Sequence, residues 1–211
     1  MRKAVLSTMM VALTWGTAMG QQPQMPMSPR GTAATQVSGK WVEEKPGSAP
    51  AYRDGKWIVI DYGRPILRGR ANIWGSGADY GKTLNAEAPV WRAGANATTR
   101  LRTEAPLVFG TTTVAPGEYS VFVDLKPGAW TFILSSQPAQ KQYDPNEKVA
   151  TIGAYNYDPK YDVVRVPMRL ESIPFSLDQL TFGFVDVTDR GGTIGLWWGT
   201  QQAMVDFRIG G

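Results

Sequence analysis

Histidine and cysteine are both absent from the 211-residue chain. Without histidine there is no Ser-His-Asp triad, no Cys-His pair and no His-ligated zinc or copper, because the reacting atoms are missing. Without cysteine there is no thiolate nucleophile, iron–sulfur cluster or disulfide. The sequence also has no G-x-x-x-x-G-K-[ST] loop and no G-x-G-x-x-G at a strand-to-helix junction. We therefore expect no cofactor, no metal and a fold stabilised by apolar burial alone.

Long apolar runs are scarce, and the one clear run lies at the start of the chain. Arg2 and Lys3 precede the apolar run Ala4–Leu13, and the small residues of Ala18-Met19-Gly20 follow it. This layout predicts a secretory signal peptide over residues 1–20, cut before Gln21. The run is shorter than the roughly 18 residues that a spanning helix needs. We expect an exported protein, periplasmic or extracellular, with no membrane insertion after cleavage.

Excess charge is also small. The formal net charge is +4, and two of the positive charges, Arg2 and Lys3, belong to the predicted signal peptide. A remainder this small does not indicate a nucleic-acid partner or an anionic membrane surface. The basic pI is therefore interpreted as an ordinary surface property.

The predicted domain begins near residue 51. Between Gln21 and Pro50 the chain carries five prolines, interspersed with Gln, Met, Ser, Thr and Gly. Such a composition buries too little apolar surface to offset the entropy of ordering. The sequence therefore predicts a flexible Pro-rich leader over 21–50 and a single domain over 51–211.

From Trp57 onward apolar residues alternate with polar ones in short runs, which is typical of half-buried strands. Turn sequences separate the runs, including Lys126-Pro127-Gly128 and Asp189-Arg190-Gly191-Gly192, which predict hairpins. No helical period lasts three turns, and any helix is expected to be short, near 76–88 or 138–148. The pattern predicts an all-β, antiparallel sandwich or jelly-roll-like fold of roughly nine or ten strands. Its core residues are expected to be Trp130, Phe132, Phe182, Phe184, Leu196 and Trp198.

One segment, Asp61–Thr99, is dense in residues that binding surfaces use. Arginine offers a planar fork of donors, aromatic rings offer stacking faces, and asparagine both donates and accepts. A structural interpretation stays open, because arginine can stack on tryptophan and close a rigid corner without a ligand. If this segment is a site, Trp91 should face the core and Arg92 the rim. The candidate binding residues are Tyr62, Arg64, Arg70, Tyr80, Trp91, Arg92 and Asn96.

Spaced motifs extend through this segment and beyond it. They include Tyr62-Gly63-Arg64-Pro65, Arg68-Gly69-Arg70, Ile73-Trp74-Gly75, Tyr80-Gly81-Lys82, Trp91–Asn96, Ala115–Ser120, Trp130–Leu134, Asp162–Val166 and Leu196-Trp197-Trp198. In this order they resemble the bacterial family called domain of unknown function 2911, over about residues 55–209. The resemblance implies an exported β-rich domain and brings no activity, substrate or catalytic residue with it.

Three functions remain open at this point. The arginine and aromatic cluster favours a non-catalytic binding module for a glycan, a cell-wall fragment or an envelope protein. The chain contains 18 acidic residues, so a glycan hydrolase that uses two carboxylates is an alternative, although no acid stands in a catalytic motif. A purely structural envelope protein is the third. The sequence favours a protein that is not an enzyme without deciding the question.

Overall fold

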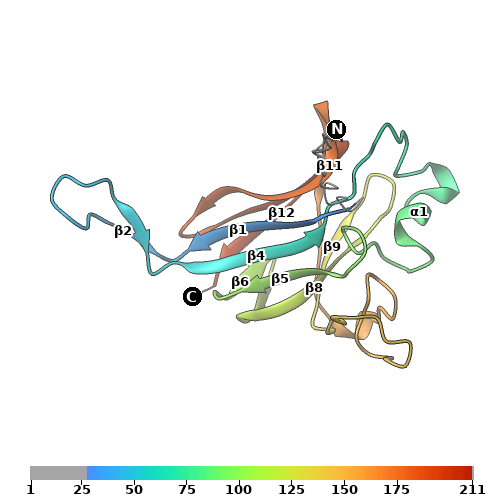
Figure 1. Ribbon diagram of the computed structural model, residues 1–211, viewed down its shortest axis with the longest axis horizontal. Helices are drawn as coiled ribbons and strands as arrows, with labels where there is room; N and C mark the ends of the chain where they lie inside the picture. Colours follow the sequence, from blue (N-terminus) through green and yellow to red (C-terminus); the bar gives the residue numbers. More distant parts are fainter. Residues whose placement is uncertain (1–27, 211) are drawn as a thin grey trace, which may run out of the picture.

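The computed structural model describes residues 28–210 (Figure 1). The predicted signal peptide and the first part of the predicted leader lie outside this range. Helix in the described residues is limited to three short elements, η1 (Gly77–Asp79), α1 (Lys82–Asn85) and η2 (Pro159–Tyr161). None of the helices described is long and apolar enough to cross a membrane.

Antiparallel strands form the rest of the regular structure. The larger sheet has the order β1 (Arg30–Val37), β4 (Lys56–Gly63), β5 (Thr99–Thr103), β8 (Gly117–Asp124), β9 (Thr131–Ser135) and β10 (Asp162–Pro167). The smaller sheet has the order β11 (Arg169–Thr188), β12 (Gly191–Ile209), β6 (Leu107–Phe109) and β7 (Thr112–Val114). A separate hairpin of β2 (Lys40–Val42) and β3 (Ala51–Arg53) projects from one end (Figure 1).

The predicted all-β sandwich is confirmed, with twelve strands among the residues described rather than nine or ten. Both predicted hairpins form, since β8 pairs with β9 and β11 pairs with β12. The predicted short helix near 76–88 is also present, as η1 and α1. Turn chemistry and period-two alternation were therefore sufficient to predict the fold class and these two hairpins.

The main core lies between the two sheets. Side chains from β4, β5, β8 and β9 on one sheet meet those from β11 and β12 on the other. The predicted core residues Trp130, Phe132, Phe182, Leu196 and Trp198 are buried, and Phe184 is partly buried against them. Tyr62 contacts Phe182 edge to face, with ring centroids 4.9 Å apart, and links the two sheets at this point.

A second, smaller apolar cluster covers the outer face of the larger sheet. Phe122 of β8 and Ile133 of β9 are fully buried although their neighbours in sequence face the main core. Val90 and Ala154, from two loops, cover them. Buried residues on both faces explain why β8 reads as a continuous apolar run in its centre.

The predicted flexible leader, residues 21–50, is wrong where it contains β2 (residues 40–42) and, over a longer stretch, for residues 30–37. These residues form β1, which pairs with β4 along its whole length, from Arg30 opposite Gly63 to Val37 opposite Lys56. Ala33 and Val37 are buried against the core. The prolines that suggested a leader lie before and after this stretch but not inside it. Averaging composition over 30 residues therefore hid an eight-residue strand that has one apolar face.

Candidate functional site

The connection between β4 and β5 builds the candidate site, at the end of the sandwich opposite the β2–β3 hairpin (Figure 1). Two isolated bridges attach this connection to the sheets, Ile66 with Gln179 and Trp91 with Val123. At the second bridge both backbone hydrogen bonds measure 2.8 Å. The Asp61–Thr99 segment is therefore held on both sheets rather than hanging as a free loop.

Four tryptophans pack together here, Trp74 and Trp91 from the connection, Trp130 directly before β9 and Trp198 from β12. Trp74 lies in the middle, with ring centroids 5.7 Å from Trp91, 4.6 Å from Trp130 and 5.7 Å from Trp198. The other three are each only 1% exposed. Their indole N–H groups all donate hydrogen bonds, to Gly94 O, Tyr80 Oη and Asp178 O respectively. Trp91 and Trp198 form the floor of the pocket described next, and at 1% exposure neither has a free face for a ligand to stack on.

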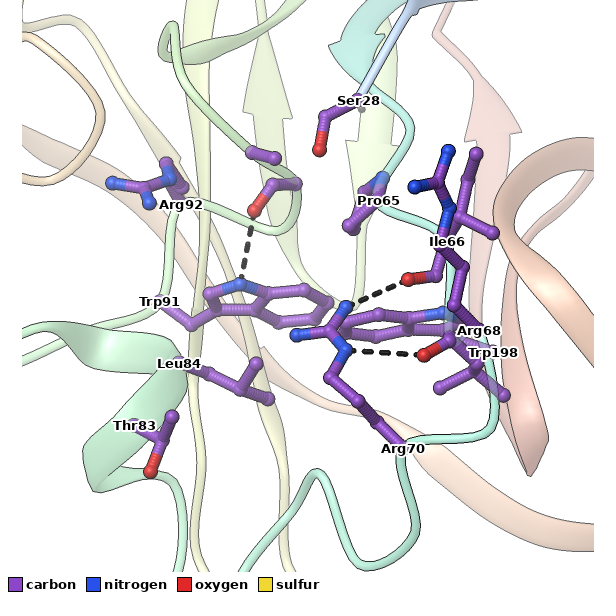
Figure 2. Close-up of a pocket in the computed structure, with 13 residues that line it drawn as sticks. Ser28, Pro65, Ile66, Arg68, Arg70, Thr83, Leu84, Trp91, Arg92 and Trp198 are labelled. Carbon is purple, nitrogen blue, oxygen red and sulfur yellow. Dashed lines mark hydrogen bonds between the residues drawn. The ribbon is translucent and has the colours of Figure 1, made fainter. Parts of the chain in front are cut away.

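A pocket of about 360 Å³ opens above this floor (Figure 2). Apolar residues form most of its walls, and three arginines stand around its edge. The lining residues are Ser28, Pro65, Ile66, Leu67, Arg68, Arg70, Thr83, Leu84, Trp91, Arg92, Gly94, Ala95 and Trp198. No carboxylate lines this pocket. Its volume lies near the lower end of the range for small-molecule pockets, roughly 300–1,000 Å³.

Arg70 is exposed, and its guanidinium is held in place at the edge of the pocket. Its Nη2 donates to Ile66 O at 2.8 Å and its Nε donates to Leu67 O at 3.2 Å. The guanidinium carbon lies 5.8 Å from the ring centroid of Trp198, within cation–π distance. Figure 2 shows Arg70 lying over the indole rings on the same side as Arg68. Two carbonyls and a ring therefore hold the cation in place without neutralising it.

Arg68 stands beside Arg70 at the mouth of the pocket. Its backbone is left-handed, with φ 48°, and its N–H donates to the Asp178 carboxylate at 3.1 Å. The rest of the residue is exposed. In residues 28–210 neither Arg68 nor Arg70 has a carboxylate within ion-pair distance of its side chain, and the same is true of Arg92. Three cationic groups thus surround one pocket without an acidic partner.

Arg92 lies on the opposite edge of the pocket (Figure 2). The predicted orientation is confirmed, because Trp91 is buried and Arg92 is half-buried at the rim. Within the described chain the Arg92 Nε atom is buried without a hydrogen-bond partner. Burial also lowers the pKa of the Arg92 guanidinium below its ordinary value. Gly153 makes room for the side chain, since a Cβ there would lie 2.6 Å from Arg92 Nη1.

The structure brings three of the predicted site residues together and places four elsewhere. Arg70, Trp91 and Arg92 line the pocket, whereas Tyr62, Arg64, Tyr80 and Asn96 do not.

The four residues outside the pocket form hydrogen bonds within the fold. Tyr62 Oη accepts from Phe182 N, and Tyr80 Oη accepts from Trp130 Nε1. Arg64 donates to Leu180 O at 3.3 Å and to Thr181 Oγ1 at 3.5 Å. Asn96 donates to Ser28 O at 3.5 Å. These four hold the fold around the site.

Sequence reasoning did not place several lining residues in the site. Leu84 and Thr83 come from α1, Ser28 from the stretch before β1, and Trp198 from β12, more than 100 residues after Arg70. Period-two alternation marked Trp198 as a core residue, which it also is. Arg68 had a local signal, because it lies two positions before the predicted Arg70 in the same arginine-glycine motif, and Pro65, Gly94 and Ala95 also lie in the spaced motifs.

A hydrolase that uses two carboxylates would need a pair of acids about 5–10 Å apart across a groove. No acidic residue lines the arginine pocket, and one acidic residue, Glu87, lines a neighbouring pocket. In the described residues no group of three or more His, Cys, Asp or Glu side chains could hold a metal ion. The geometry of the candidate site therefore suits the binding of an anion better than carboxylate-dependent hydrolysis.

The fold and pocket define an antiparallel β-sandwich with an open cationic pocket at one end. A family model described as "Protein of unknown function (DUF2911)" matches residues 47–207. The chain belongs to this family, as its spaced motifs predicted. Comparison with curated proteins gave no match, and comparison with solved structures gave none either.

Proposed function

We propose that this chain is an exported binding module that holds a small, carboxylate-bearing cell-wall fragment in the arginine pocket. The observation that carries the proposal is the charge of that pocket. Arg68, Arg70 and Arg92 surround it, no acid lines it, and none of the three side chains forms an ion pair among the residues described.

The residue type favours a carboxylate over a neutral ligand. A guanidinium presents its donors in a planar fork that matches the two oxygens of a carboxylate. Like-charged groups around one cavity repel each other, and a bound anion removes that repulsion. Arg70 is already oriented by Ile66 O and Leu67 O, so little side-chain entropy is lost when a ligand binds.

The walls favour a ligand with an apolar face beside its charge. Pro65, Ile66, Leu67 and Leu84 provide carbon surface next to the arginines. The closed tryptophan floor does not supply the stacking platform that was expected from the sequence, since Trp91 and Trp198 are each 1% exposed. A volume of about 360 Å³ suits one substituted sugar ring or a short acidic peptide rather than a polymer.

The proposal agrees with the predicted export. A protein that leaves the cytoplasm meets cell-wall fragments, and these carry carboxylates on both sugar and peptide. The alternative of a purely structural envelope protein makes the opposite forecast, since the arginines would then only brace the connection between β4 and β5. Binding of an acidic ligand by the unsubstituted chain would support the binding module, and absence of binding would support the structural protein.

A thermal-shift comparison tests the proposal. N-acetylmuramic acid and glucuronic acid are the acidic probes, and N-acetylglucosamine and glucose are their neutral counterparts. A ligand that binds only the native state raises the melting temperature. We expect a larger rise with the acids, and we expect Arg68→Ala to lose most of it.

Arg190→Ala is the matched control, because Arg190 is exposed, lies in the β11–β12 turn and carries the same charge. It should keep the full response to the acids. An equal response from Arg68→Ala and Arg190→Ala, or no response of the parent chain to either acid, would contradict the proposal.

A further inference from the structure

A second pocket, of about 350 Å³, lies next to the first. The segment from Asn85 to Pro89 forms one wall, and Ile152 and the segment from Ala154 to Tyr157 form the other. Arg92 lines both pockets. The two cavities therefore share one side chain.

Several hydrogen bonds fix the wall that carries the two tyrosines. Asn156 has a left-handed backbone, with φ 64°, and its Nδ2 donates to Glu147 O at 2.9 Å. Gln137 Nε2 donates to both Val149 O and Asn156 O at 2.6 Å. Tyr157 Oη donates to Asp162 Oδ2 at 2.6 Å and accepts from Arg165 Nη1 at 3.1 Å. The pocket is pre-organised, which lowers the entropic cost of binding.

Two buried polar atoms at this pocket have no partner in the described part of the chain. One is an acceptor, the side-chain oxygen of Asn85, and the other is a donor, Nε of Arg92. A buried polar group without a partner is unfavourable and rare in native proteins. Each atom is itself buried, so a ligand hydroxyl would reach it only after a small movement of the pocket wall, and a hydroxyl suits both atoms because it donates and accepts.

The remaining lining residues favour an uncharged ring. Tyr155 is 60% exposed and offers an open aromatic face, which the buried tryptophans of the first pocket do not. Glu87 supplies one negative charge and Arg92 one positive charge, so this pocket lacks the cationic excess of its neighbour. An aromatic face beside unpaired hydrogen-bonding atoms is the chemistry that recognises a sugar.

We infer that this second pocket is a neutral-sugar subsite, and that the two pockets together hold a disaccharide with one acidic and one neutral ring. The inference rests on the proposed function of the arginine pocket. The acidic ring occupies that pocket, the neutral ring lies against Tyr155, and Arg92 contacts both. The ligand is thus a glycan fragment of at least two residues rather than an acidic monosaccharide or a peptide.

Calorimetric titration of the full chain tests this inference with two probes, N-acetylmuramic acid and its disaccharide with N-acetylglucosamine. The parent should bind the disaccharide more tightly. Tyr155→Ala should weaken the disaccharide about fivefold to tenfold, the order expected for one lost aromatic contact, and leave the monosaccharide unchanged. Tyr143→Ala is the matched control, because Tyr143 is 63% exposed and lines neither pocket.

Asn85→Ala provides a second readout that does not depend on Tyr155. Because this substitution removes an unpartnered buried oxygen, the melting temperature should stay the same or rise while affinity for the disaccharide falls. Equal affinity of the parent, Tyr155→Ala and Asn85→Ala for the disaccharide would overturn the inference and leave the arginine pocket intact. Failure of the parent to bind either probe would overturn both proposals.

Discussion

The interior of the sandwich and the pockets at its end differ in how their polar atoms are partnered. In the interior the polar atoms of aromatic residues have partners: Tyr62 Oη accepts from Phe182 N, and Trp130 Nε1 donates to Tyr80 Oη. At the pockets the side-chain oxygen of Asn85 and Nε of Arg92 have none within residues 28–210. Of the three buried side-chain atoms without a partner in residues 28–210, two belong to residues that line the pockets, and the third, Asp162 Oδ1, does not.

The arginines show the same contrast. Arg100 and Arg165 lie on the larger sheet and pair with carboxylates, at 2.9 Å to Glu118 and 2.8 Å to Asp162. Arg68 and Arg92 at the pocket have no such partner in the part of the chain described, although Arg92 is half-buried. Residue type alone therefore did not distinguish a structural arginine from a candidate ligand-binding one. The candidates at the pocket are identified by two features together, the absence of a carboxylate partner and a place in the pocket lining, because Arg64 also lacks an ion pair but holds the fold through Leu180 O and Thr181 Oγ1.

The largest effect is expected from deleting β1. A chain that starts at residue 51 loses the eight-residue pairing of β1 with β4 and the burial of Ala33 and Val37. We expect a loss of more than about 3 kcal/mol in the free energy of unfolding, or roughly 6–12 °C in melting temperature. A chain that starts at Ser28 is the control. Equal melting curves for the two would show that β1 does not contribute to the fold.

Phe182→Ala should have the next largest effect. Phe182 is buried between the sheets against Tyr62, so the cavity left behind should cost about 3–5 kcal/mol of unfolding free energy in a denaturant titration. Phe175→Ala serves as the control, because Phe175 is an exposed aromatic of the same strand, β11. A cost below about 1 kcal/mol for Phe182→Ala would contradict the described packing.

Arg92→Ala should affect binding far more than stability. No carboxylate in the described chain pairs with Arg92, so its loss removes no buried ion pair, and we expect less than about 1 kcal/mol of destabilisation. Affinity for the acidic probes should fall at least tenfold by calorimetry. If the variant instead lost several kcal/mol and bound the probes normally, Arg92 would belong with the structural arginines.

The smallest effect concerns alkaline pH. Burial, and then the hydrogen bond to Asp162, raise the pKa of Tyr157 above its ordinary value. In the unfolded chain this phenol ionises near pH 10, so above that pH the folded state binds more protons and stability falls. The parent should therefore lose its advantage over Tyr157→Phe as pH rises past about 10, by less than about 1.4 kcal/mol per unit. A constant difference from pH 8 to 11 would contradict the raised pKa.

Much of the fold was predictable from the sequence because its signals are local. Alternation placed Phe182 and Leu196 in the core, and glycine-containing turn sequences placed the two hairpins. β1 was missed because its eight residues lie between two proline-rich stretches. The outer cluster at Phe122 was missed because a distant loop that contains Ala154 covers it, and no local pattern indicates that cover.

The candidate site was predicted only in part for a similar reason. Arg70, Trp91 and Arg92 lie on one connection, and their density was a visible signal. Tyr62 and Tyr80 carry the same kind of side chain, but tertiary contacts engage their hydroxyls inside the fold. Which aromatic residue remains exposed depends on packing across more than 100 residues of sequence. Tyr155 of the second pocket had no signal beyond an ordinary turn.

Anion binding by the arginine pocket is tested most directly with the chain that carries no substitution. Its affinity for N-acetylmuramic acid is compared with its affinity for the methyl ester of that acid. The two ligands share the same ring and differ in the negative charge that the three arginines should bind. By calorimetry at neutral pH we expect the acid to bind at least tenfold more tightly, because the ester offers no charge to the guanidinium groups. Equal affinities, or no binding of the acid, would contradict an anion-binding role for this pocket.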